Sequence, residues 1–172
     1  PRGFVKMWTM EDLTPLLGAG LEGNRDFKNG RQMFGAGTCY VCHRFNGEGG
    51  AVGPDLSSVG GKFSPYDLLE SIVDPGKEIS DQYGSSIFNL KDSSQVIGRI
   101  MNMKGDNYWV NTDMMTPSTT TNVNADDIES IEPSPVSMMP PGLIASMKDD
   151  DILDLLAYLI SGGNPDHELF DK

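Results

Sequence analysis

The chain has 172 residues, 38% of them hydrophobic, and it carries 25 acidic against 13 basic residues, a formal net charge of −12. This length suffices for one domain, or for one domain with a sizeable insertion, that buries a real core. The acidity argues against binding to nucleic acid or anionic membranes, which need a basic surface, and no apolar run approaches the length of a membrane span. We interpret the acidity mainly as a source of solubility, and secondly as steering toward a basic patch on a partner.

Two helices are expected before the middle of the chain. Thr9 can cap the first helix, with Asp12 at its third position completing a capping box. The second is expected over residues 27–36, where it places Gly30 and Phe34 one turn apart. This second helix leads directly into a motif that carries the chemistry.

That motif, Cys-Tyr-Val-Cys-His, occupies residues 39–43. The thiols of Cys39 and Cys42 can form thioether bonds to the two vinyl groups of a haem, and His43 then presents a ring nitrogen to the iron. A structural zinc site would need four ligands, but the chain has no further cysteine and only one further histidine, His167. A thioredoxin-like centre needs a βαβ context that the flanks do not supply, and a disulfide across so short a loop would contribute little. The motif favours covalent attachment of one haem c.

Such attachment normally occurs outside the cytoplasm, so a periplasmic or otherwise extracytoplasmic location is expected. The lack of a signal-like amino terminus then indicates a processed form or an excised piece of a longer protein.

After the motif, residues 47–61 are rich in glycine, which suits a backbone that wraps closely around a flat ligand. Ser64-Pro65-Tyr66-Asp67 combines an N-cap, a proline at the first helical position and a capping-box acid, and it predicts a third helix that stops at Asp74-Pro75-Gly76. From about residue 83 to 131, short runs of β-branched and aromatic residues alternate with polar turns. They predict three to five antiparallel strands, which need packing against the helical part for stability.

A last helix is expected to start near Ser146, with three aspartates in its first turn, and to end at Ser161-Gly162-Gly163. Residues 164–172 are expected to form a loosely held tail.

His43 leaves one axial position of an iron to fill, and Met139 stands out among ten methionines because two prolines stiffen the backbone just after it. Met138 is the alternative sixth ligand, and His167 is poorly placed.

Taken together, these features resemble a class I cytochrome c. The residues that carry the resemblance are Gly30, Phe34, Cys39 to His43, Gly53-Pro54-Asp55-Leu56, Met139-Pro140-Pro141, Leu155 and Tyr158. The resemblance implies a mainly α, monohaem fold with a small antiparallel β insertion between the third helix and the axial-methionine loop. It further implies that the Pro54 carbonyl accepts the Nδ1 hydrogen of His43. Its remaining implication is a haem-binding environment formed by Phe34, Leu56, Leu155 and Tyr158, with Gly30 and Phe34 against the last helix.

More narrowly, the chain resembles the planctomycete and verrucomicrobium type of haem-binding domain. Further carriers are Trp8, Arg25-Asp26-Phe27, Asp81-Gln82-Tyr83, Ser134 to Pro140 and Leu155 to Leu159. The implied layout is a helical extension over residues 1–24, a haem-binding fold over 25–82 and 133–163, the insertion over 83–132 and the tail over 164–172. In this family the domain often ends a long secreted or membrane-associated protein that also carries a propeller-like dehydrogenase module. Ser93-Ser94 departs from the glycine-containing turn expected there, so that turn is expected to be longer or looser.

The residues and the resemblance favour an electron carrier over an independent enzyme, since no paired-carboxylate or Ser/His/Asp arrangement occurs. The expected partner is a redox protein or a fused dehydrogenase module with a basic docking patch, without nucleic acid and without membrane insertion. The alternative is a haem-based sensor of gas or redox state in which the axial methionine is displaced. The β insertion, larger than electron transfer demands, motivates that alternative and equally a docking role.

Overall fold

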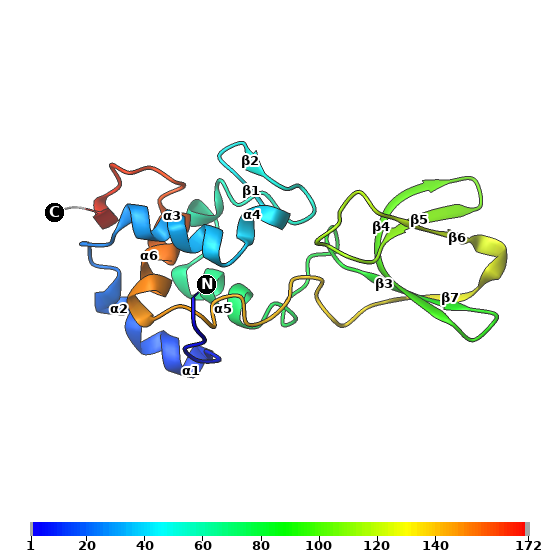
Figure 1. Cartoon of the computed structure of the whole chain (residues 1–172), viewed down its shortest axis with the longest axis horizontal. Helices are drawn as coiled ribbons and strands as arrows, with labels where there is room; N and C mark the ends of the chain where they lie inside the picture. Colours follow the sequence, from blue (N-terminus) through cyan, green and yellow to red (C-terminus); the bar gives the residue numbers. More distant parts are fainter. Residues whose placement is uncertain (1, 171–172) are drawn as a thin grey trace. The chain divides into compact units, whose positions relative to one another are not determined.

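A computed structural model describes residues 2–170, whereas Pro1 of the expected extension and residues 171–172 of the expected tail lie outside the described residues. The chain divides into two compact units (Figure 1). The first unit is formed by the chain up to Pro75 and again from Pro141, and the second by Gly76–Pro140. The expected insertion, residues 83–132, falls inside the second unit.

The first unit is helical. Its elements are α1 (Met10–Leu13), the 3-10 turn η1 (Thr14–Leu16), α2 (Leu17–Gly20), α3 (Phe27–Ala36), α4 (Cys39–Cys42), η2 (Val59–Gly61), α5 (Pro65–Val73), α6 (Asp149–Ile160) and η4 (Glu168–Phe170). Two strands of two residues each, β1 (Arg44–Phe45) and β2 (Glu48–Gly49), pair antiparallel just after α4.

Local sequence signals set most of these helix boundaries. Thr9 and Asp12 form the expected capping box at the start of α1, and Ser64 and Asp67 form the second one at the start of α5. Asp26 caps α3, where its carboxylate accepts from the backbone N–H of Asn29 at 3.0 Å. Helix α6 begins three residues after the expected start, at the first of its three aspartates.

Helices α3 and α6 make the most extensive contact between elements of the first unit. A Cβ atom on Gly30 would lie 2.3 Å from the backbone oxygen of Asp154 and 2.8 Å from Cβ of Tyr158, so only glycine allows this approach. Polar groups secure one end of the contact, because Asp154 accepts from the side chain of Asn29 at 2.9 Å and from the backbone N–H of Asp26 at 3.0 Å. Around the crossing lies one hydrophobic core whose fully buried members are Leu13, Met33, Leu69, Met147, Ile152, Leu155 and Leu156.

The described part of the tail is held more firmly than expected. Leu169 accepts a backbone hydrogen bond from Arg25 at 2.9 Å, and the ring of Phe170 packs edge-on against Phe27 with centroids 5.3 Å apart. His167 is half-buried, and its Nδ1 lies 3.3 Å from the backbone nitrogen of Leu169. The tail is ordered because the ring of Phe170 buries apolar surface against Phe27, a contact that the mostly polar composition of this segment did not suggest.

The second unit is a five-stranded antiparallel sheet. Its strands are β3 (Ser86–Leu90), β4 (Gln95–Lys104), β5 (Asn107–Asn111), β6 (Thr121–Asn124) and β7 (Ile128–Pro133), in the order β6-β5-β4-β3-β7, with the 3-10 turn η3 (Ala125–Asp127) before β7. The long strand β4 pairs with β3 over its first four residues and with β5 from Arg99 onward, and the pairing with β5 contains a bulge between Ile100 and Asn102. Phe88, Val110 and Val123 form a hydrophobic cluster that belongs to this unit alone. The number of strands is the upper limit of the expectation.

Four residues, 91–94, separate β3 from β4, so the turn is longer than a two-residue hairpin, and hydrogen bonds close it. Ser93 donates to the carbonyl of Leu90 at 2.9 Å, and Leu90 donates back to the carbonyl of Ser94 at 2.9 Å. Ser93 adopts φ +70°, the left-handed conformation that usually selects glycine. The serine therefore carries a conformational cost.

The expectation of a mainly α chain does not hold, because only 33% of the residues are helical. Three of the α-helices, α1, α2 and α4, are single turns of four residues. The second unit contributes a complete sheet where the expected insertion was small. The chain is better described as a helical unit and a β unit.

Candidate haem site

The motif sits on a single helical turn that follows a sharp change of chain direction. Helix α3 ends at Ala36, and Thr38 takes the left-handed conformation with φ +55° before α4 begins at Cys39. A left-handed β-branched residue is rare and marks a position that its surroundings determine. Because Cys39 and Cys42 are three residues apart on this turn, their side chains lie on the same side of it.

The two cysteines are thiols and not a disulfide. Burial raises the pKa of Cys39 to about 11 and also raises the pKa of Cys42. Raised values keep both groups protonated near neutral pH, unlike the reactive thiolates of redox-active C-x-x-C sites. The site therefore lacks the electrostatics of the thioredoxin-like alternative.

His43 follows α4 in an extended conformation, and its backbone N–H donates to the carbonyl of Cys39 at 2.9 Å. Its Nδ1 lies 2.8 Å from the carbonyl oxygen of Pro54, the contact that the resemblance implies. A carbonyl can only accept, so Nδ1 carries the hydrogen and Nε2 remains as the nitrogen that can ligate a metal. Burial lowers the pKa of His43, against the opposing effect of the Pro54 hydrogen bond, and so favours the neutral ring that ligation requires.

The glycines after the motif let the loop lie against the motif itself. A Cβ atom on Gly49 would lie 2.3 Å from the carbonyl oxygen of His43, and one on Gly50 would lie 2.1 Å from that of Val41. At Gly53 the added atom would lie 2.7 Å from Cε1 of the His43 ring. Gly53 also donates its backbone N–H to Cys42 at 2.8 Å. These glycines are needed for close approach to the protein's own backbone and to the His43 ring, and the wrap around a ligand stays a prediction.

The other expected pocket residues belong to the core of the first unit. Leu155 is fully buried, Leu56 is partly buried, and the rings of Phe34 and Tyr158 lie 5.9 Å apart. Phe34 and Tyr158 also line a small cavity of about 200 Å³ together with Tyr40, the residue after the first cysteine. The structure thus brings Phe34 and Tyr158 together at the crossing of α3 and α6, while His43 is not among the residues that line this cavity.

Met138 and Met139 lie at the end of the second unit, in the segment that follows β7. The backbone N–H of Met139 donates to the hydroxyl of Ser137 at 3.1 Å, which orders the local chain. Ligation of iron by either methionine stays a prediction.

Two residues of the site escaped the sequence analysis in their actual roles. Gly53 was noted only as part of a Gly-Pro-Asp-Leu stretch, although it provides the space that the His43 ring occupies. Thr38 makes the turn into the motif, although Gly35 and Gly37 just before it are the residues that composition favours there. A left-handed threonine leaves no signal in a single sequence.

The donor set fits a covalently bound haem. It offers two thiols on one side of a turn, an adjacent imidazole with Nδ1 engaged, and a loop whose glycines leave room for that ring. A helical unit with this attachment site defines a haem protein of the c type.

Comparison with known families agrees. The cytochrome c family model matches residues 27–132, and the chain belongs to this family. Membership implies covalently bound haem c and haem-based electron transfer, generally without enzymatic activity, and cytochrome c domains are typically extracytoplasmic. No curated protein gives a significant match to the chain. Among residues 2–170, no helix is both long and apolar enough to cross a membrane.

Proposed function

We propose that the chain is a one-electron carrier whose haem c is attached through Cys39 and Cys42 and ligated by His43 and Met139. The observation that carries the proposal is the contact of 2.8 Å between Nδ1 of His43 and the Pro54 carbonyl, within an intact attachment motif. This hydrogen bond orients the ring and increases the electron donation of Nε2. The resemblance to the planctomycete and verrucomicrobium type belongs to the proposal as well.

The haem, when bound, supplies the iron that cycles between the ferric and ferrous states. The protein keeps the proximal side in one arrangement during this cycle. The short turn of α4 fixes both thiols, while Gly53 and Pro54 leave the His43 ring little freedom to rotate. A rigid ligand environment suits rapid transfer because little has to move when the charge changes.

Met139 as the second axial ligand would complete a six-coordinate, low-spin iron. A thioether favours ferrous iron, so the reduction potential would be higher than with two histidines. Pro140 and Pro141 support the choice of Met139, because both restrict the chain immediately after it. The matched comparison is Met138, its neighbour, which has the same side chain and is followed by Met139 instead of a proline.

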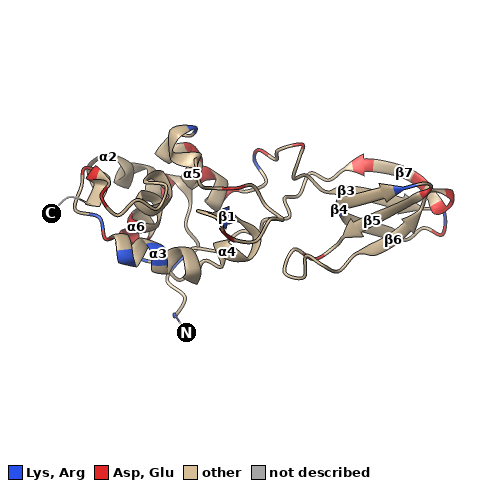
Figure 2. Cartoon of the chain, turned by 90° about the horizontal axis from the view of Figure 1, so that it is seen from above, with Lys and Arg blue, Asp and Glu red and all other residues tan. Residues whose placement is uncertain are grey.

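The proposed partner is a redox protein, or a dehydrogenase module of the same polypeptide, with a basic docking patch. Acidic residues occur on both units and outnumber basic ones, 25 to 13 over the whole sequence (Figure 2). Two haem propionates would add negative charge. Association should therefore weaken as ionic strength rises. We also propose a periplasmic or otherwise extracytoplasmic location.

Visible spectra of the haem-loaded protein in both oxidation states test the ligation. Methionine ligation predicts a low-spin spectrum with the weak sulfur-to-iron charge-transfer band in the ferric state. Met139→Ala should abolish that band, whereas Met138→Ala should retain it. A high-spin ferric spectrum across neutral pH would contradict the proposal, and the reverse result for the two variants would transfer the role to Met138.

Carbon monoxide separates an electron carrier from a haem-based sensor. A carrier with both axial positions filled should show no spectral change when the ferrous protein meets the gas. Rapid formation of a CO adduct by the unmodified protein would favour the alternative, in which the methionine yields its place.

A further inference from the structure

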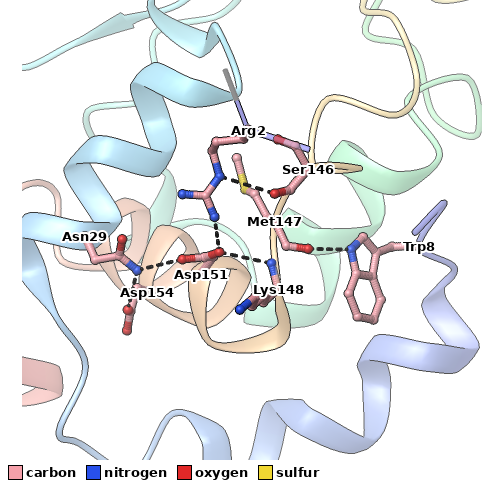
Figure 3. A network of polar contacts seen from close by, with 8 residues as sticks. All are labelled: Arg2, Trp8, Asn29, Ser146, Met147, Lys148, Asp151 and Asp154. Atoms are coloured by element: carbon pink, nitrogen blue, oxygen red, sulfur yellow. Dashed lines mark hydrogen bonds and ion pairs between the residues drawn. The ribbon is translucent and has the colours of Figure 1, made fainter. Parts of the chain in front are cut away.

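Residues 2–8 form an arm without helix or strand that contacts the segment of residues 142–147, which joins Pro141 to α6. Figure 3 shows Arg2 and Trp8 of the arm beside Ser146 and Met147 of the segment. Three consecutive carbonyls of that segment accept hydrogen bonds from the arm. Ala145 accepts from the backbone N–H of Val5 at 2.8 Å, Ser146 from Nε of Arg2 at 3.2 Å, and Met147 from the indole N–H of Trp8 at 3.1 Å. The arm therefore contacts the segment at successive residues.

Two further contacts extend the attachment at both ends. Arg2 also pairs with Asp151 in the first turn of α6, and Asp151 accepts from the backbone N–H of Lys148 at 3.0 Å (Figure 3). At the other end, the Cε atom of Met7 lies 3.2 Å from where a Cβ on Gly142 would stand. Gly142 has φ +80°, so the chain changes direction there in a conformation that glycine tolerates.

The segment under the arm has few regular backbone hydrogen bonds of its own. It consists of turns, in which Ala145 donates to Gly142 and Met147 donates to Ile144, each at 3.0 Å. Its apolar anchors, Ile144 and Met147, are buried in the core of the first unit. Without the arm, the three carbonyls would depend on solvent, and local opening of the segment would cost less free energy than it does with the arm in place, with Ile144 and Met147 as its remaining anchors.

We propose that the arm is a positioning element for the axial methionine. The inference rests on the proposed function, in which Met139, three residues before Gly142, ligates the iron. The mobility of a ligand on a loop depends on how firmly the backbone is restrained on both sides of it. The arm restrains the backbone on the side toward α6. Arg2 and Trp8 are the positioning residues, and their loss should make the thioether easier to displace.

Competition with exogenous imidazole measures that displacement in the haem-loaded, full-length chain. Imidazole replaces the thioether in the ferric protein, and the loss of the sulfur-to-iron band reports the exchange. Trp8→Phe retains an aromatic ring and removes the N–H donor, and Arg2→Gln removes the charged donor. Each should raise the apparent affinity for imidazole roughly two- to tenfold, the range for the loss of one hydrogen bond. Hydrogen exchange of residues 142–147 should quicken in both variants.

Two control variants separate positioning from a general loss of stability. Ser64→Ala removes the cap of α5 and lowers global stability without touching the arm. Lys28→Gln, on the exposed surface of α3, makes the same charge change as Arg2→Gln. Both should bind imidazole as the unmodified protein does.

The outcomes distinguish the inference from the function on which it rests. Unchanged imidazole affinity in Trp8→Phe and Arg2→Gln, with the band present, would overturn the positioning role alone. The same increase in Ser64→Ala would do so too, because stability would then explain it. A band that is absent in the unmodified protein would overturn methionine ligation, and the positioning role with it.

Discussion

Replacement of Gly30 by alanine tests how closely α3 and α6 must approach. The added Cβ would lie 2.3 Å from the backbone oxygen of Asp154 and 2.8 Å from Cβ of Tyr158. Neither atom can move away by a rotamer change, so the helices must separate by about 1 Å to reach ordinary contact distances. A gap of that size removes roughly a quarter to a half of the dispersion energy of the contacts it opens.

The magnitude follows from two opposing effects. Overpacking of a core costs about 1–3 kcal/mol, and the upper end applies here because a backbone atom forms one side of the clash. Alanine regains about 1 kcal/mol over glycine in helix propensity. We therefore expect Gly30→Ala to lower the free energy of unfolding of the first unit by about 2 kcal/mol.

Gly35→Ala is the matched control, because it makes the same exchange in the same helix. A Cβ on Gly35 meets no heavy atom within 4 Å, so this variant should gain stability, by up to about 1 kcal/mol. Urea unfolding of the haem-loaded protein, followed by haem absorbance, should then show unfolding constants that differ by roughly a hundredfold between the two variants. If Gly30→Ala unfolds at the same urea concentration as Gly35→Ala, the close approach does not limit the packing of these helices.

Three other substitutions address the turn, the proximal ligand and the response to acid. Ser93→Gly should stabilise the β unit by about 1 kcal/mol in thermal unfolding, because glycine adopts φ +70° without strain; an equal or lower melting temperature would contradict this. Gly53→Ala should displace the His43 ring and break its hydrogen bond to the Pro54 carbonyl. The loss of that bond should raise the reduction potential by at most about 60 mV, the equivalent of one hydrogen bond. An unchanged potential would show that the ring keeps the hydrogen bond when it moves. Hydrogen bonds from Ser64 hold the pKa of Asp67 below its ordinary value of 3.8, so its stabilising effect is present above that pH and is lost as the pH falls further. Asp67→Asn should therefore flatten the decrease of melting temperature between about pH 4 and 2, and an unaltered slope would assign that decrease to other carboxylates.

Local signals predicted the helices well. The bounds of α3 and the start of α5 follow from the sequence, because a cap and a proline act on the residues next to them. The strands likewise lie where short runs of β-branched and aromatic residues were expected, between about residues 83 and 131. Strand β7, with two glutamates among its six residues, has a weaker pattern, and its pairing with β3 compensates for that.

Contacts between distant parts of the chain could not be predicted. Trp8 was named only as a carrier of the family resemblance, yet its indole reaches the carbonyl of Met147 across 139 residues. Gly53 was expected only as part of a glycine-rich loop, and its contact with the ring of His43 became visible in the fold. Hydrophobic periodicity and capping patterns involve only residues that are close in sequence. They therefore carry no information on contacts between residues that are distant in sequence. Of the candidate site, the motif could be read directly, whereas the space around its histidine required the fold.

The pairing of β3 with β7 has a consequence for how the chain assembles. The two strands are the first and last of the sheet, and their outer ends, Ser86 and Pro133, stand opposite each other. A folded sheet thus reduces the flexible link between the two halves of the helical unit from roughly 65 residues to roughly 17, which lowers the entropic cost of closing that link by about 1 kcal/mol. The folded sheet therefore shortens the flexible chain that connects the two halves of the helical unit. Adjacent ends of this kind also allow one module to be exchanged for another at a single point of the scaffold, so variation can accumulate in the sheet while the haem-binding residues stay as they are.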